Sequence, residues 1–193
     1  MVNLIYRNWA KAGLLFSLVI LAYIYLIQKH EISLLDKYIL LNLAFLMLHQ
    51  FEEYVYPGTF KEYFNTRLYN PFGFFRNKLT DKGILWVNVV LGWGMNILVF
   101  IFLKDNPVAV MSAIAIIFIN GIMHFTVTFK TRYYNPGVVT GAVFFLPLGI
   151  YSFNKLYTTN LIKITDIPFI LGFALLGSLM IPITIYLCRE KRR

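Results

Sequence analysis

Cysteine is almost absent from the sequence, since Cys188 is the only one. A single thiol cannot form a disulfide within the chain, and it excludes a metal or redox site built on paired cysteines. Chemistry that depends on two thiols is therefore set aside, and any metal ligands must be histidines or carboxylates.

Charged residues are also scarce, and acidic ones are the scarcest. They make up 14% of the 193 residues, with 9 Asp and Glu against 18 Lys and Arg. Hydrophobic residues reach 59%, against roughly 45–50% in soluble domains, and the mean hydropathy is +0.65. This composition excludes an ordinary soluble domain and predicts a single integral-membrane domain over residues 1–193.

Six apolar segments approach the roughly 20 residues that a helix needs to cross the hydrocarbon core. We expect an all-α bundle of about six transmembrane helices, near Ala12–Gln28, Leu34–Val55, Ile84–Leu103, Val108–Phe129, Val138–Asn154 and Ile167–Cys188. No small-residue cleavage site follows the first segment, so we interpret it as a retained span rather than a signal peptide.

Lys and Arg are unevenly distributed between the loops. With six spans, 13 of the 18 fall on the side that holds both termini and the second and fourth loops. Because cytoplasmic loops are enriched in Lys and Arg, we expect both termini in the cytoplasm and a multi-pass protein of a plasma membrane, in bacteria the inner membrane. The net charge of +9 then indicates membrane lipids as partners and no nucleic acid.

The second loop, residues 56–83, interleaves aromatic and basic residues, among them Arg67, Arg76 and Lys78. Such a segment beside a span is typical of the headgroup layer, with aromatic rings inserted and cations facing phosphates. We expect a cytoplasmic interfacial loop that either gates the lateral entry of a lipid or only anchors the chain to the surface.

Three titratable residues, His49, Glu52 and Glu53, occur within five positions near the end of the second span. The apolar part before them, Tyr38 to Leu48, is too short to cross alone, so they lie in or near the cytoplasmic half of the bilayer. Two uncompensated carboxylates there cost on the order of 5 kcal/mol. No Lys or Arg lies at that depth in the predicted spans, so a metal cation, a proton or a water-filled cavity must compensate them.

Helical periodicity places these three side chains on one helix face. His49 and Glu53 are one turn apart, as are the two zinc-binding histidines of an HExxH helix, whose Glu is the general base. We therefore predict His49 and Glu53 as metal ligands and Glu52 as the catalytic base. The reversed assignment of the two carboxylates stays open.

The fourth span contains His124 at a similar predicted depth, which makes it the candidate third ligand. Asn120 lies one turn earlier, where it either orients a ligand or hydrogen-bonds a neighbouring helix. Tyr134 precedes the turn at Pro136 and Gly137. Its hydroxyl either takes part in catalysis as a hydrogen-bond donor or belongs to an ordinary interfacial tyrosine.

Three motifs occur in order, His49-Gln50-Phe51-Glu52-Glu53, Asn120-x-x-x-His124 and Tyr134-Asn135-Pro136-Gly137. With them the chain resembles the HXXEE domain proteins, a family of small multi-pass membrane proteins with accompanying NxxxH and YxPG motifs. The resemblance runs from the second predicted helix to the start of the fifth. It implies a membrane-embedded enzyme and brings no established substrate or reaction.

These observations lead to the hypothesis of an intramembrane metal-dependent hydrolase, with zinc as the expected divalent metal. His49, Glu53 and His124 would bind it, Glu52 and Tyr134 would be catalytic, and a lipid or membrane-bound peptide near the cytoplasmic leaflet would be the substrate. One alternative is a proton-coupled transporter or channel with Glu52 and Glu53 as proton carriers. The other is a lipid-binding accessory protein in which the same residues only pack.

Overall fold

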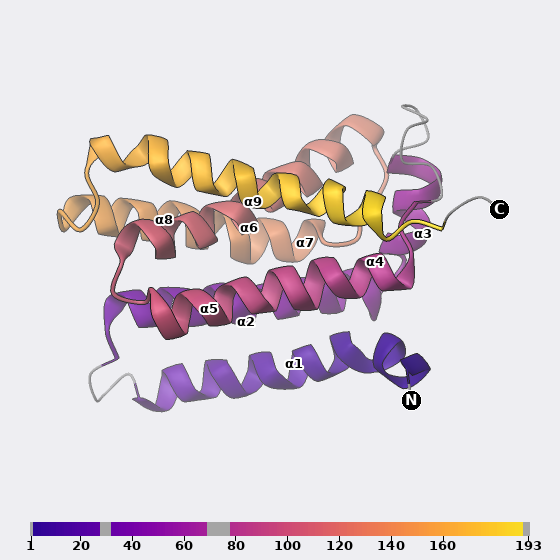
Figure 1. Ribbon diagram of the computed structural model, residues 1–193, viewed down its shortest axis with the longest axis horizontal. Helices are drawn as coiled ribbons and strands as arrows, with labels where there is room; N and C mark the ends of the chain where they lie inside the picture. The colour runs from indigo at the N-terminus through magenta and orange to yellow at the C-terminus, as the bar shows by residue number, and fades with distance from the viewer. Residues whose placement is uncertain (1, 28–31, 69–77, 191–193) are drawn as a thin grey trace.

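The computed structural model describes residues 2–27, 32–68 and 78–190. Every regular element in these ranges is helical, which confirms the predicted all-α fold. The long helices lie side by side along one axis, and the start of α1 and the end of α9 are at the same end of the bundle (Figure 1).

The uninterrupted long helices are α1 (Val2–Ile27), α2 (Leu34–Tyr54), α6 (Pro107–Thr131) and α9 (Ile167–Leu187). Two further long segments each contain a π-helical stretch between α-helices. They are α4 (Asp81–Leu85), η3 (Trp86–Trp93) and α5 (Gly94–Phe102), and α7 (Val138–Thr140), η4 (Gly141–Phe145) and α8 (Leu146–Thr158). The short elements α3 (Phe60–Tyr63) and η1 (Phe64–Leu68) follow α2, and η5 (Ile164–Asp166) precedes α9.

Within the described residues, 5 helical segments are long and apolar enough to cross a membrane: Ile5–Leu26, Asp81–Phe102, Pro107–Thr131, Val138–Thr158 and Ile164–Leu187. Large apolar side chains on these segments point outward, as with Leu15 and Phe169, because lipid rather than water is the expected surroundings. The chain is therefore an integral multi-pass membrane protein. The first of these segments begins before Arg7 and Lys11, earlier than we expected, because α1 continues through both residues.

Helix α2 is not among the 5 apolar segments, because polar and charged residues lower its hydropathy. It is instead the helix that the others enclose, packing against α1, α5 and α6. Its buried residues occur on all sides, and its Asn42 Nδ2 donates to Asn96 Oδ1 in α5 at 2.7 Å. On another side, Ser17 Oγ in α1 donates to the Ala44 carbonyl at 3.0 Å. Protein rather than lipid thus surrounds the polar residues of α2.

The interfacial loop predicted at residues 56–83 is described over 56–68 and 78–83, and Arg76 lies outside these ranges. Helix α3 and η1 fold back against the end of the bundle that carries the end of α2. Lys61 Nζ pairs with Asp81 Oδ1 at 2.6 Å, and Asn65 Nδ2 donates to the Leu79 carbonyl. These contacts hold both parts of the loop against the start of α4.

Two glycines let α6 approach η4 closely. A Cβ placed on Gly141 would lie 3.3 Å from the Gly121 Cα, and one on Gly121 would lie 3.1 Å from the Phe145 Cβ. Small residues at such a crossing allow backbones to approach, which is how helices gain van der Waals contact in lipid. The crossing lies three residues from His124 on α6 and one residue from Thr140 on α7, so it sets the spacing between these side chains.

We expect Gly121→Val to lower the thermal stability of the detergent-solubilised protein, because overpacking a tight contact costs about 1–3 kcal/mol. Gly172→Val is the matched control, since a Cβ there meets no atom within 4 Å. Melting temperatures of both variants check this. Equal melting temperatures would show that the Gly121 crossing is not a tight contact.

Candidate metal centre

Three buried side chains from two helices meet at one point. His49 and Glu53 come from α2 and His124 from α6, and their exposed fractions are 1%, 5% and 4%. Glu53 Oε1 lies 3.5 Å from His49 Nε2 and 3.3 Å from His124 Nε2. One potential ligand atom from each residue lies within 4.8 Å of the other two, so the group could hold a metal ion.

The cluster carries a carboxylate that no Lys or Arg neutralises among the described residues, where the ion pairs of Glu53 are with the two histidines. A buried carboxylate is expensive unless a cation or proton compensates its charge. In addition, His124 Nδ1 is buried and has no hydrogen-bond partner within the described chain. Two imidazole nitrogens and one carboxylate oxygen form a donor set that suits zinc, so these residues fit a divalent cation.

Glu52 has the same burial but different partners. Its Oε1 accepts hydrogen bonds from the Tyr134 hydroxyl at 2.5 Å and from the Val139 amide at 3.2 Å. Its Oε2 accepts from the Thr140 amide at 2.8 Å and from the Thr140 hydroxyl at 2.5 Å. This carboxylate therefore joins α2 to the start of α7, where backbone amides favour an anion.

Tyr134 lies between α6 and α7, half-exposed, with its hydroxyl on Glu52. Burial of part of the side chain, together with the adjacent Glu52 carboxylate, raises the pKa of Tyr134 above its ordinary value. The phenol therefore keeps its proton at neutral pH and donates it in the hydrogen bond to Glu52. This side chain connects the surface of the protein to a carboxylate beside the cluster.

His49 has two more polar neighbours. Its Nδ1 lies 2.9 Å from the Thr140 hydroxyl, and its Nε2 lies 3.3 Å from Asn120 Nδ2. Asn120 thus lies next to His49 rather than next to His124, the histidine one turn after it. Thr140 is a neighbour that the sequence reasoning missed.

Gly137 closes the cluster on one side. Its φ angle is +101°, and a Cβ there would lie 2.6 Å from His49 Cε1 and 2.9 Å from His124 Nδ1. Aromatic rings lie on other sides, with Phe145 4.5 Å from the His49 ring and Phe60 5.5 Å from the His124 ring, measured between centroids. Backbone and aromatic rings therefore enclose the histidines on these sides, whereas Thr140 and Asn120 are their polar neighbours.

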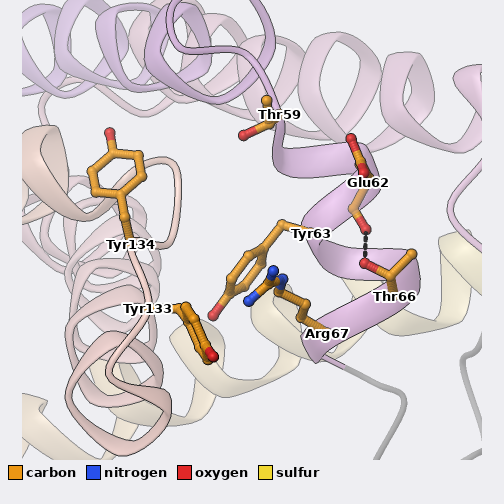
Figure 2. Close-up of a pocket in the computed structure, with 7 residues that line it drawn as sticks. All are labelled: Thr59, Glu62, Tyr63, Thr66, Arg67, Tyr133 and Tyr134. Atoms are coloured by element: carbon orange, nitrogen blue, oxygen red, sulfur yellow. Dashed lines mark hydrogen bonds between the residues drawn. The ribbon is translucent and has the colours of Figure 1, made fainter.

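A pocket of about 310 Å³ opens beside the cluster. Figure 2 shows Tyr133 and Tyr134 on one wall and Thr59, Glu62, Tyr63, Thr66 and Arg67 on the other. The Arg67 guanidinium lies over the Tyr133 ring at 4.3 Å, and Tyr134 belongs to both the pocket wall and the hydrogen bond to Glu52. Tyr134 thus links the pocket wall to the buried Glu52 carboxylate.

Asn88 is a buried polar residue whose contacts lie apart from the cluster. Asn88 accepts a hydrogen bond from Gln50 Nε2 at 3.2 Å and donates to the Tyr54 hydroxyl at 3.3 Å. Trp93 Nε1 donates to Gln50 Oε1 at 2.6 Å. These contacts join α2 to η3 and do not include the His49 cluster.

We expect Gly137→Ala to disrupt the cluster, because the added methyl group overlaps both imidazoles and the positive φ disfavours an L side chain. Gly58→Ala is the matched control. Its φ is +75°, and its Cβ would meet the backbone of Tyr54 and Val55 rather than the histidines. Zinc affinity measured by competition with a chelator should fall in Gly137→Ala beyond any loss in Gly58→Ala. Unchanged zinc affinity in Gly137→Ala would contradict the close packing of Gly137 against His49 and His124.

Comparison with protein families finds the HXXEE motif that occurs at residues 49–53. No curated protein and no solved structure matches the chain. A model of a family described as proteins of unknown function with an HXXEE motif matches residues 40–152, which include the candidate ligands, Glu52, Tyr134 and Thr140. Since this match covers more than half of the chain, the protein belongs to the HXXEE family.

Proposed function

We propose that this protein is an intramembrane metal-dependent hydrolase that acts on an amphiphilic substrate. The observation that carries the proposal is the convergence of His49, Glu53 and His124 in a buried site without a neighbouring Lys or Arg ion pair among the described residues. His49, Glu53 and His124 would bind a divalent cation, with zinc favoured by the donor set. When bound, such a cation supplies Lewis acidity and favours deprotonation of water.

The substrate reaction would be hydrolysis of an ester or amide. The water oxygen bonds to the carbonyl carbon, the bond to the leaving oxygen or nitrogen breaks, and a water proton ends on that leaving atom. Glu52 is the base that we assign to this proton, and Tyr134 the hydrogen-bond donor on the pocket side. The short contact between Glu52 and Tyr134 supports this pairing, because it joins the carboxylate that directly precedes Glu53 in the sequence to the pocket wall.

The polar part of the substrate would occupy the pocket beside Tyr134. The volume of about 310 Å³ suits a small headgroup rather than a whole lipid. Arg67 offers a cation for a phosphate or carboxylate group, and the exposed apolar surface of the helices offers a path for acyl chains. A lipid or a membrane-bound peptide satisfies both requirements.

The site would face the cytoplasmic leaflet of a plasma membrane. This orientation follows if α2 crosses with the five apolar segments, which gives six spans and places both termini in the cytoplasm. The enclosure of α2 by α1, α5 and α6 supports its crossing despite its polar residues. At its opposite end, Asp36 Oδ2 lies 3.8 Å from Lys104 Nζ, which suits the external headgroup layer.

Metal binding and hydrolysis are tested with one set of variants. We expect the purified protein to bind about one equivalent of zinc in equilibrium dialysis, and His49→Ala and His124→Ala to lose it, because each removes one of three proposed ligands. His30→Ala is the control, since His30 precedes α2 and lies 19 residues before His49 in the sequence.

Activity is then measured on fluorogenic short-chain ester and amide amphiphiles. We expect Glu52→Gln to keep zinc and lose about 100-fold or more in kcat, as removal of a general base does. Zinc binding without hydrolysis of any tested amphiphile, or full activity in Glu52→Gln, would contradict the hydrolase. Proton flux through reconstituted vesicles that depends on Glu52 and Glu53 would favour the transporter alternative.

A further inference from the structure

The Thr140 hydroxyl lies near three polar atoms, but it has only one hydrogen to donate. Its Oγ1 lies 2.5 Å from Glu52 Oε2 and 2.9 Å from His49 Nδ1, with the Gly137 carbonyl further away at 3.4 Å. A threonine hydroxyl has one hydrogen to donate and lone pairs to accept with. The directions of these contacts are therefore fixed once the strongest acceptor is known.

Glu52 is the strongest acceptor beside Thr140. An ionised carboxylate only accepts, and both oxygens of Glu52 already face donors, namely the Tyr134 hydroxyl and the amides of Val139 and Thr140. With so many donors aimed at it, Glu52 receives the Thr140 proton as well. The Thr140 oxygen is then left as an acceptor toward His49.

The contact between Thr140 Oγ1 and His49 Nδ1 requires a hydrogen on His49. Because Thr140 Oγ1 can only accept at that point, His49 Nδ1 must carry a hydrogen and donate it. In the neutral ring this leaves Nε2 unprotonated, and Nε2 is the atom that faces Glu53 Oε1 and Asn120 Nδ2. Asn120 can donate its amide hydrogen to this lone pair when no cation is present.

We infer that Thr140, oriented by its hydrogen bond to Glu52, is a positioning residue that fixes His49 in the tautomer with hydrogen on Nδ1 and so presents its Nε2 lone pair to a metal. In many metal sites a carboxylate or carbonyl accepts directly from the second nitrogen of a histidine ligand. Here a threonine hydroxyl stands between the imidazole and the carboxylate. The consequence for metal affinity rests on the proposed function, whereas the tautomer itself does not.

The two adjacent glutamates have different contacts. Glu53 faces the histidines directly, and Glu52 acts on His49 through the start of α7. Replacing Thr140 by Val removes the hydroxyl at nearly constant volume, and replacing it by Ser restores the hydroxyl. Thr128→Val is the matched control, because the Thr128 hydroxyl is buried without a hydrogen-bond partner among the described residues.

The test uses the full-length protein with ¹⁵N-labelled histidine in detergent, free of metal, at about pH 8, above the ordinary histidine pKa of about 6.5. Long-range ¹H–¹⁵N spectra report which ring nitrogen is protonated, and His49→Ala identifies the His49 signals. We expect the Nδ1–H tautomer in the parent, in Thr140→Ser and in Thr128→Val, and a shift toward the Nε2–H tautomer in Thr140→Val.

Zinc affinity provides the second readout. Loss of an orienting partner typically weakens metal binding by 10–100-fold, so we expect this loss in Thr140→Val, with recovery in Thr140→Ser. An Nε2–H tautomer in the parent, or an unchanged tautomer in Thr140→Val, would overturn the inference. A parent that shows the Nδ1–H tautomer and binds no zinc would instead overturn the proposed function and leave the tautomer assignment standing.

Discussion

The contact between the Glu53 carboxylate and two imidazoles is the interaction on which the rest of the site depends. In an apolar bundle, a carboxylate without a neighbouring Lys or Arg is unfavourable, and Glu53 meets only histidines among its described ion-pair partners. A cation or a shared proton between these groups removes the penalty. This arrangement is buried near the end of α2, which favours a functional over a merely structural reason for it.

The fold meets this constraint by making α2 the enclosed helix. Residues that would be costly against lipid are placed against protein, with Asn42 on Asn96, Gln50 on Asn88 and Trp93, and Glu52 on the start of α7. The close crossing of Gly121 and Gly141 then brings His124 and Thr140 to the same end of α2. The same helix positions therefore give the buried polar side chains their hydrogen-bond partners and bring the residues of the candidate metal centre together.

Much of this site was predictable from the sequence because helical periodicity is local. The spacing of His49 and Glu53 and the similar depth of His124 placed the three together. The contacts of Glu52 were not predictable, because they depend on how the start of α7 approaches α2. Only the folded chain shows that Thr140, Gly137 and Phe60 reach the histidines.

The limits of the spans were predicted less well, for physical reasons. Helix α1 continues through Arg7 and Lys11, since long cationic side chains can extend to the headgroups from within a helix. Helix α8 continues to Thr158, beyond the predicted end at Asn154, because helical hydrogen bonding does not stop where hydropathy falls. The π-helical stretches η3 and η4 have no recognisable sequence signal, although η4 includes Gly141 at the helix crossing.

X-ray absorption spectroscopy of the zinc-loaded protein at the zinc edge would identify the ligands at His49, Glu53 and His124. A metal centre on these three residues predicts scattering from two imidazole rings and at least one carboxylate oxygen at about 2.0–2.2 Å. A shell of water oxygens without imidazole scattering, or zinc that is lost on washing, would contradict a metal centre at His49, Glu53 and His124.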